Sequence, residues 1–222
     1  MLEKMGEFFD ARIEGYEAHQ LNTIVGAAEF YPFTAGLLPR EPGARVLDLG
    51  CGTGLELGHY FELAPTAHVT GIDLAPGMLD ELRKRFSDRS MTLICGSYFD
   101  VPFGEDVFDA AVSVESLHHF TKEEKIPLYA KLRKALKPGG YFILTDYFAA
   151  SEAEERFRRA ELLRLKQEQN LPDGAFYHYD TPLTVAHETE ALLQVGFGSV
   201  TVLKNWGHTY TLKAGTDPDR AG

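Results

Sequence analysis

Short apolar runs recur through the middle of the chain, and each is followed by a segment with room for a helix or a long crossover. The runs occupy residues 45–49, 67–72, 91–95, 107–114 and 140–147. Parallel strands need such crossovers, because the chain must return to one end of the sheet before the next strand begins. The alternation therefore predicts an α/β fold, a doubly wound and mostly parallel sheet with helices on both faces.

Capping and turn residues place helices between these runs. Pro76 can open a helix at its first position, and Thr121 and Ser151 can each begin a capping box. Pro127 lies inside the helix after Thr121, so we expect that helix to begin late or to kink. The turn at residues 137–140 should end it.

The two ends of the chain predict further elements. Phe9, Ile13 and Tyr16 fall at helical spacing, which predicts an amphipathic N-terminal helix that could fold over a bound ligand. Residues 197–214 read as two strands that close the edge of the sheet as a hairpin. A charged helix at 152–169 carries one apolar stripe, formed by Ala153, Phe157, Ala160 and Leu163.

The composition limits the classes of partner. With 222 residues, the chain is long enough for one domain with a sizeable core. No apolar run reaches membrane-spanning length and the first residues are acidic, so we expect a cytoplasmic protein with no membrane partner. The chain has 22 basic and 33 acidic residues, and a net charge of −11 argues against nucleic acid as a partner. Cys51 and Cys95 belong to no C-x-x-C pair and should be free thiols.

Residues 46–57, VLDLGCGTGLEL, place three glycines between a strand and a helix start. Glycine allows positive φ and close approach of a ligand, and a helix N-terminus offers free N–H groups. Such a turn binds a dinucleotide or S-adenosylmethionine. The dinucleotide fingerprint needs a further glycine where this chain has Leu55 or Leu57, whereas Asp48 suits a ligand with an ammonium and a sulfonium group. An NAD-dependent oxidoreductase is therefore the less favoured alternative.

Ligands of this fold class bind beyond the carboxyl ends of the strands, where the strand order reverses. The segments at those ends are residues 48–54, Asp73, residues 96–98, residues 115–120 and residues 146–148. A carboxylate in the position of Asp73 can take both hydroxyls of a ribose. These segments therefore hold the candidate site.

Four stretches together resemble the class I S-adenosylmethionine-dependent methyltransferases, among the methyltransferase-domain enzymes of small molecules. They are VLDLGCGTG (46–54), VTGIDLAPGML (69–79), FDAAVSVESLHHF (108–120) and LRKALKPGGYFILTDY (132–147). The resemblance implies a seven-stranded sheet with a reversed final hairpin. It also implies S-adenosylmethionine as cofactor, S-adenosylhomocysteine as product, and a small-molecule acceptor with an O, N or S nucleophile.

One methyltransferase domain is expected over residues 1–222. Aromatic residues at 176–179 could form a lid with the N-terminal helix, and they favour an apolar, aromatic or cationic acceptor. The expected parts are a helical cap (1–40), a cofactor-binding core (41–150), a helical lid insert (151–182), and a final helix with the closing hairpin (183–214).

The resemblance carries cofactor roles onto matching positions. The loop glycines would line the methionine portion with Asp48 near its ammonium, Asp73 would hold the ribose, and Leu74 and Met78 would flank the adenine. Relatives often have Asp where this chain has Ser97, which implies altered adenine recognition. The candidate cofactor-binding residues are Tyr16, Asp48, Gly50, Cys51, Gly52, Gly54, Asp73, Leu74, Met78, Ser97, Tyr98 and Glu115.

Candidate catalytic residues follow the fourth and fifth strands. His118 and His119 lie where the acceptor should bind, and Asp146 ends the neighbouring strand. A histidine oriented by a carboxylate is a common general base. The ESLHH stretch resembles some sugar-hydroxyl methyltransferases, which implies such a base pair, and His119 is the preferred member. The alternative is that both histidines only shape the pocket.

The sequence predicts no metal site. It contains no H-E-x-x-H motif, and His118 and His119 would point apart in an extended segment. A third reading is a cofactor-binding protein that has lost catalysis and acts through partners, with Ser97 as the feature in its favour. Cofactor binding without turnover of any acceptor would distinguish that reading.

Overall fold

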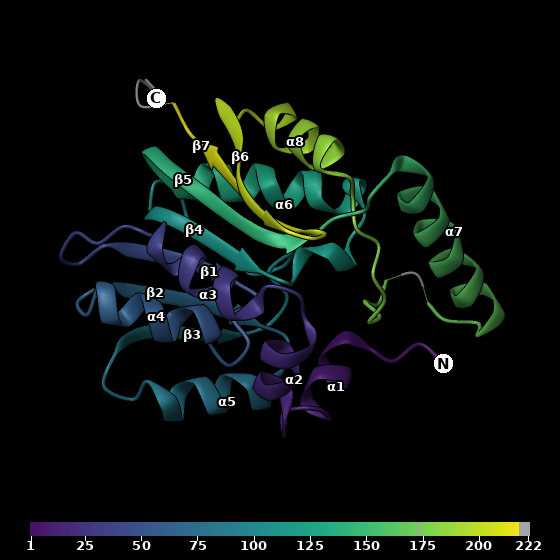
Figure 1. Cartoon of the computed structure of the whole chain (residues 1–222), viewed down its shortest axis with the longest axis horizontal. Helices are drawn as coiled ribbons and strands as arrows, with labels where there is room; N and C mark the ends of the chain where they lie inside the picture. Colours follow the sequence, from purple (N-terminus) through teal and green to yellow (C-terminus); the bar gives the residue numbers. More distant parts are fainter. Residues whose placement is uncertain (173, 218–222) are drawn as a thin grey trace.

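Seven strands form one sheet in the computed structural model, which describes residues 1–172 and 174–217. The strand order is β3-β2-β1-β4-β5-β7-β6 (Figure 1). Strands β1 to β5 are parallel, and β7 is antiparallel to both of its neighbours. The predicted parallel sheet with a reversed final hairpin is confirmed. The strands are β1 (Arg45–Leu49), β2 (His68–Asp73), β3 (Ser90–Cys95), β4 (Phe108–Val114), β5 (Leu136–Tyr147), β6 (Ser199–Trp206) and β7 (Thr209–Gly215).

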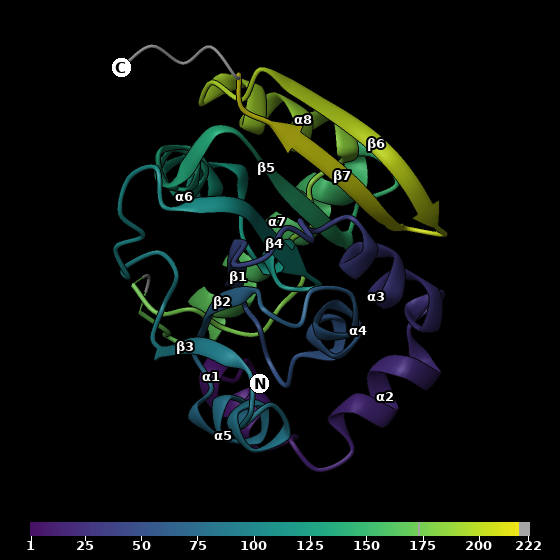
Figure 2. The same ribbon diagram turned by 90° about the vertical axis from the view of Figure 1, so that its left-hand side faces the viewer.

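Helices cover both faces of this sheet (Figures 1 and 2). Apolar side chains of α3, α4 and α5 pack into one core cluster, and those of α6 and α8 pack into another. No described helix is long and apolar enough to cross a membrane. The helices are α1 (Met5–Asp10), α2 (Tyr16–Thr23), α3 (Ala27–Gly36), α4 (Leu55–Leu63), α5 (Pro76–Arg85), the 3₁₀ turn η1 (Leu117–His119), α6 (Lys122–Ala135), α7 (Glu152–Glu168) and α8 (Val185–Gln194).

The strand order reverses between β1 and β4, the two central neighbours. From β1 the chain moves outward through β2 and β3, and it then returns to β4 and continues to β5 on the other side. The crossovers therefore diverge at this point and leave a crevice beyond the carboxyl ends of β1 and β4. The segments that the sequence predicts as ligand-binding lie at these ends.

Helix starts follow the predicted capping residues. Pro76 is the first residue of α5, and the Thr121 capping box is complete. The expected late start of α6 is wrong, because the box satisfies the first turn and the helix begins at Lys122 despite Pro127. Residues 137–140 do not form a separate turn but belong to the first part of β5.

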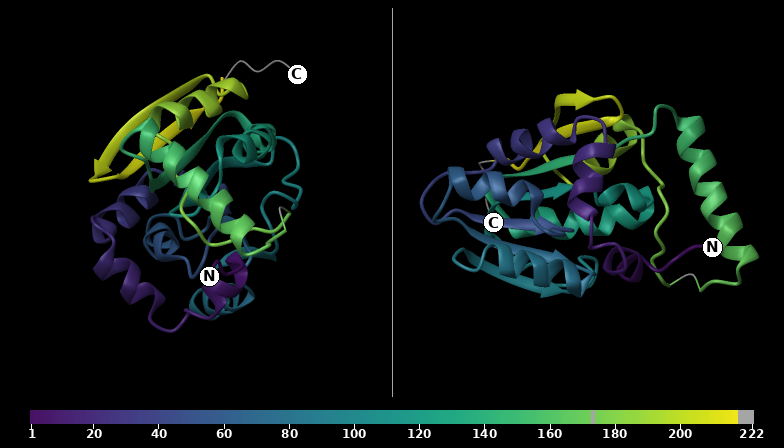
Figure 3. Two further views of the ribbon diagram at one scale, coloured as in Figure 1. Left: turned by 90° about the vertical axis from the view of Figure 1, so that its right-hand side faces the viewer. Right: turned by 60° about the horizontal axis from the view of Figure 1, so that its bottom comes forward.

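The N-terminal segment forms two helices instead of the single predicted one. Gly15, at a φ of +82°, separates α1 from α2. Residues 3–5 pair with residues 176–178: Met5 N–H donates to the Phe176 carbonyl at 3.0 Å, and His178 N–H donates to the Glu3 carbonyl at 2.9 Å. The two segments therefore lie side by side (Figure 3), and their role as a lid stays a prediction.

The apolar stripe of α7 does not pack against the body. Every side chain of α7 is half-buried or exposed, and Phe157 and Leu163 are 63% and 51% exposed. The contacts of α7 with the body come from its other side, where Glu155 accepts from Thr184 N–H and pairs with His187. Helical periodicity identified the stripe correctly, but it could not show which side of the helix faces the protein.

Candidate functional site

The three loop glycines have different surroundings. A Cβ on Gly50 would collide with Ser116 Oγ, and a Cβ on Gly54 would collide with Leu82 of α5. A Cβ on Gly52 would meet no described atom within 4 Å, so this glycine faces open space. Gly50 and Gly52 line a cavity, whereas Gly54 lets the start of α4 approach α5 and does not line it.

This first cavity, which we name the cofactor cavity after the ligand that the sequence predicts there, has a volume of about 50 Å³. Asp73, at the carboxyl end of β2, accepts from the N–H groups of Gly52 and Ala75 at 2.9 Å each. Burial raises the pKa of the Asp73 carboxyl, although these N–H groups oppose the shift. The lining residues are Met5, Phe9, Tyr16, Gly50, Gly52, Asp73, Leu74, Met78, Tyr98, Val114, Glu115, Ser116, His119 and Phe120.

Asp48 lies fully buried beneath the glycine loop. Among the described residues, neither of its carboxylate oxygens has a hydrogen-bond partner by geometry. Burial raises the pKa of Asp48 well above its ordinary value, and the neighbouring Glu56 carboxyl raises it further. Burial and the adjacent Glu56 carboxyl therefore favour a neutral Asp48, which does not line the cofactor cavity of the described chain.

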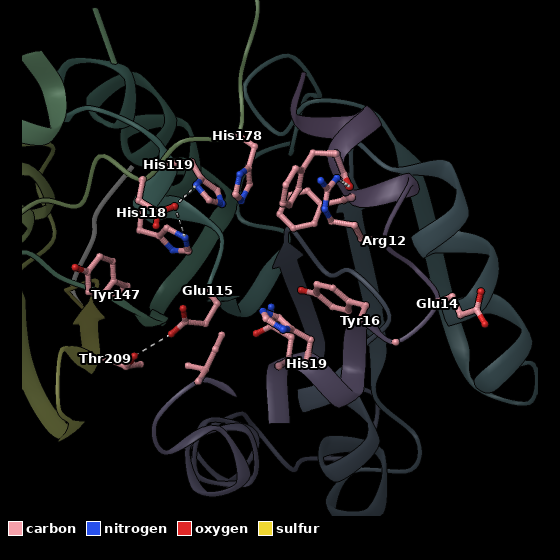
Figure 4. A pocket seen from close by; sticks show the side chains of 16 residues that line it. Arg12, Glu14, Tyr16, His19, Glu115, His118, His119, Tyr147, His178 and Thr209 are labelled. Atoms are coloured by element: carbon pink, nitrogen blue, oxygen red, sulfur yellow. Dashed lines mark hydrogen bonds and ion pairs between the residues drawn. The ribbon is translucent and has the colours of Figure 1, made fainter. Parts of the chain in front are cut away.

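A second and larger cavity, which we name the acceptor cavity after the ligand that the sequence predicts there, adjoins the first and has a volume of about 710 Å³ (Figure 4). Phe9, Tyr16, Glu115 and His119 line both cavities and so form a common wall. Glu115 holds a φ of +49°, a strained value for a non-glycine residue, and its carboxylate accepts from Thr209 Oγ1 at 3.1 Å. Burial raises the pKa of Glu115 to about 7. The remaining lining residues are Phe8, Arg12, Glu14, Gly15, His19, Gln20, Ile24, His118, Tyr147, His178, Asp180 and Thr209.

A buried histidine and carboxylate lie at the inner end of the acceptor cavity. His118 Nδ1 lies 2.5 Å from Asp146 Oδ1, and Asp146 also accepts from the N–H groups of Leu117 and Tyr147. Burial disfavours the charged imidazole, but the Asp146 carboxylate outweighs this effect and raises the pKa of His118 to about 9. The histidine that Asp146 orients is thus His118 and not His119, the member preferred from the sequence, and a catalytic role for either stays a prediction.

His119 has a different environment in the same turn. Burial and the neighbouring His118 lower its pKa to about 4, so the ring is neutral at pH 7. Its Nδ1 lies 3.2 Å from Asp180 Oδ1. Burial opposes ionisation of Asp180, but the surrounding histidines hold the pKa of that carboxyl well below its ordinary value.

The expectation that the two histidines point apart is wrong. They lie in η1, not in an extended segment, and their ring centroids are 4.0 Å apart. A 3₁₀ turn rotates successive side chains by about 120°, less than the roughly 180° of an extended strand, so that two neighbouring rings can lie in contact.

Of the other residues predicted to bind the cofactor, some line the cofactor cavity and others do not. Leu74, Met78 and Tyr98 line it as expected. Ser97 is not among the residues that line either cavity in the described chain, and its Oγ accepts from Phe99 N–H at 3.2 Å. Cys51 is buried under the loop, where burial raises the pKa of its thiol.

Several site residues escaped the sequence reasoning. Asp180 and Thr209 reach the acceptor cavity from segments distant in the chain, and no local motif marks them. Met5 covers the cofactor cavity from α1. Ser116 belongs to the loop after β4 that the sequence did single out, and its contact with Gly50 could have been considered there.

Comparison with known proteins places this architecture in a family. Residues 46–140 match the model of the methyltransferase domain. The chain is 30% identical over 161 residues to a demethylmenaquinone methyltransferase from Symbiobacterium thermophilum, covering 69% of this chain and 61% of that protein. It is also 30% identical over 128 residues to a probable tRNA methyltransferase 9B from Mus musculus, covering 57% of this chain and 27% of that protein. The chain thus spans less than two thirds of the length of these curated relatives.

Among solved structures, Streptomyces venezuelae DesVI superposes with a TM-score of 0.65. The match covers 92% of this chain and 97% of that one at 19% identity, and it therefore supports the fold alone. The matched domain, the curated relatives and the sheet order agree with one another. The chain belongs to the class I S-adenosylmethionine-dependent methyltransferases.

Proposed function

We propose that this chain transfers a methyl group from S-adenosylmethionine to a small-molecule acceptor in the acceptor cavity, with His118 as general base. The observation that carries the proposal is the pair of adjoining cavities at the point of strand reversal. One is lined by the glycine loop and Asp73, and the other holds the buried His118–Asp146 pair. The wall between them is where the two ligands would meet.

The residues of the cofactor cavity fit the proposed cofactor in type. The open side of Gly52 leaves room for the methionine portion, and Asp73 stands at the ribose position. Asp48, the residue expected near the ammonium, is buried beneath the loop and is not among the described residues that line the cavity. Leu74 and Met78 supply apolar contact for the adenine. When bound, S-adenosylmethionine supplies an electrophilic methyl group on a sulfonium.

The protein's own task is then to position and deprotonate the acceptor. Alignment of two bound reactants accounts for much of the rate in such a transfer. Asp146 fixes the ring of His118 through Nδ1, so Nε2 is the atom that would take the proton. Because the pKa of His118 is raised to about 9, the neutral base form is the minor form at pH 7, and we expect turnover of a hydroxyl acceptor to rise with pH up to about 9. An O–H acceptor gains most from this base, while amine and thiol acceptors need it less.

The acceptor cavity favours a small molecule over a polyanion. Its volume of about 710 Å³ falls in the range of small-molecule pockets. Glu115, Asp146 and Asp180 are carboxylates at or beside this cavity, and the net charge of −11 repels nucleic acid. We therefore propose a neutral or cationic small molecule as the acceptor, in preference to the tRNA that one relative's name mentions.

Thermal unfolding with single ligands tests the cofactor. At about a hundred times its dissociation constant, a ligand adds ~2.7 kcal/mol and raises the melting midpoint by roughly 5–10 °C. We expect this shift with S-adenosylmethionine and S-adenosylhomocysteine and none with NAD. A shift with NAD alone would replace the methyltransferase proposal by an oxidoreductase.

Substitution of the base pair tests the mechanism. For a hydroxyl acceptor found by a screen, His118→Asn and Asp146→Asn should each lower kcat by ~10²–10⁴ while cofactor affinity stays within about twofold. His187→Asn is the matched control, because His187 pairs with Glu155 at 2.9 Å far from both cavities. Binding of the cofactor with no turnover across hydroxyl, amine and thiol acceptors would instead favour a non-catalytic protein.

A further inference from the structure

Three side chains converge on one point at the inner end of the acceptor cavity. His118 Nε2 lies 3.6 Å from Asp180 Oδ1, and His119 Nδ1 lies 3.2 Å from the same oxygen. One ligand atom from each of the three residues lies within 4.8 Å of the others. We propose that these residues form a binding site for a divalent transition metal of the zinc class.

Two of the three separations lie close to those of a zinc coordination shell, and the third, between the two ring nitrogens, is within 4.8 Å. Bonds of about 2.0–2.1 Å in a tetrahedral arrangement put neighbouring ligand atoms about 3.3–3.4 Å apart. The distances of 3.2 and 3.6 Å from Asp180 Oδ1 to the two nitrogens lie on either side of this value. A cation could therefore enter with small movements of the three side chains.

The ring of His119 gives a second, independent observation in favour of a metal site. Its Nδ1 is buried and, within the described chain, has no hydrogen-bond partner of acceptable geometry, although Asp180 is near. An unpaired buried nitrogen costs free energy, and such groups in native proteins call for a ligand, an ion or a water. A metal would satisfy this nitrogen and the Asp180 carboxylate together.

The surroundings orient His118 as metal sites orient their histidines. Asp146 holds Nδ1 at 2.5 Å, so Nε2 is the ring atom that faces the cluster, and a metal would displace the proton that Nε2 carries in the imidazolium form. A carboxylate behind a ligating histidine is the usual outer support of a zinc ligand. Two imidazoles and one carboxylate favour zinc, cobalt, nickel or iron over magnesium and calcium. All three residues line the acceptor cavity, so a fourth coordination position would face it (Figure 4).

Metal and proton would compete for one lone pair. His118 Nε2 is also the atom that accepts the proton in the proposed methyl transfer, and on this point the inference rests on the proposed function. Zinc should therefore inhibit turnover of a hydroxyl acceptor, and a chelator should restore it.

Cobalt binding tests the site without any cofactor or acceptor. The full chain is freed of metal by dialysis against a chelator and titrated with Co²⁺, whose visible absorption is intense in a tetrahedral nitrogen–oxygen site. We expect one equivalent to bind, Zn²⁺ to displace it, and Mg²⁺ at the same concentration to leave it in place.

Substitutions in the cluster test which side chains bind the metal. Asp180→Asn and His119→Gln should each weaken Co²⁺ binding at least about tenfold. His187→Asn, which removes a histidine–carboxylate pair outside the cluster, should leave binding unchanged. The melting midpoint of each variant verifies folding, and Asp180, whose side chain is 40% exposed, tolerates an amide of the same shape.

Two results would overturn the site: no saturable Co²⁺ binding by the folded wild-type chain, or full binding by both cluster variants. Metal binding by a chain that methylates no acceptor would leave the site standing and refute the proposed function alone. Turnover that is unaffected by saturating Zn²⁺ would refute the competition at His118.

Discussion

Gly52 is one of the two glycines through which the loop lines the cofactor cavity. Its φ is +48°, and a Cβ there would meet no described atom within 4 Å. Alanine at this position should lose about 1–2 kcal/mol of stability from the left-handed backbone. Its methyl group would also occupy the cavity and should weaken cofactor binding about tenfold, the effect of ~1.4 kcal/mol of overpacking.

Gly43→Ala separates these two effects. Gly43 has a φ of +76° and equally open surroundings, but it lies before β1 and lines neither cavity of the described chain. Calorimetric titration with S-adenosylhomocysteine should show weakened binding for Gly52→Ala and wild-type binding for Gly43→Ala. Equal affinities in the two variants would show that the open side of Gly52 does not face the cofactor.

For single residues, the sequence predicts which residue types reach the site better than it predicts where their side chains point. Asp73, Leu74 and Met78 line the cavity as expected, because strand ends and helix starts fix their positions. The choice between His118 and His119 depends on the 3₁₀ turn, which the sequence does not indicate. Asp180 reaches the histidines only through the path of a distant loop.

Among the elements, α1 covers the cofactor cavity, and we propose that it acts as a lid. Met5 and Phe9 line that cavity, and its volume of about 50 Å³ is far below the ~300–1,000 Å³ of typical ligand pockets. Asp10 Oδ1 accepts from Gly77 N–H at 2.9 Å and so holds the end of α1 against the first turn of α5. We infer that α1 must move outward before the cofactor can enter.

Asp10→Ala should release this lid. Loss of a cap-like bond of about 1 kcal/mol should speed amide exchange in residues 4–10 roughly fivefold in the cofactor-free protein. Hydrogen exchange with mass spectrometry measures this, and S-adenosylhomocysteine should slow the exchange again. Glu7→Ala is the control, because Glu7 in the same helix makes only an exposed ion pair with Lys4 at 3.4 Å. Similar exchange in both variants would contradict the role of Asp10.

Elements defined by local signals are predicted well, and those that depend on distant pairing are not. The strands and the starts of α5 and α6 follow from apolar runs and capping residues near one another in the chain. The pairing of residues 3–5 with 176–178 joins segments far apart in sequence, and Gly15 divides the expected helix in two. Likewise, which face of α7 is exposed depends on where the rest of the chain packs, and the sequence of the helix alone does not show this.

For the whole molecule, the buried acids under the glycine loop set a dependence on pH. Burial raises the pKa values of Asp48, Glu56 and Asp73 in the folded chain. The folded state then binds these protons more tightly than the unfolded state, in which a carboxyl group titrates near pH 4. Their contribution to the free energy of unfolding therefore falls as the pH rises above about 4.

Asp48→Asn should remove part of this dependence. In urea unfolding without cofactor, the variant should gain stability relative to the wild type between pH 5 and pH 8, since an amide carries no charge to bury. The same comparison with Glu62→Gln, on an exposed side of α4, should show no such gain. A constant difference between Asp48→Asn and the wild type at both pH values would mean that Asp48 is ionised in the folded chain throughout.

The common wall of the two cavities also bears on how such an enzyme can diverge. His19 and Ile24 border the acceptor cavity without bordering the cofactor cavity, so selection can alter them and leave cofactor use intact. Phe9, Tyr16, Glu115 and His119 border both, and a change there alters both ligands at once. After gene duplication, we expect new acceptor preferences to arise first at the outer positions, with the four wall residues the last to be replaced.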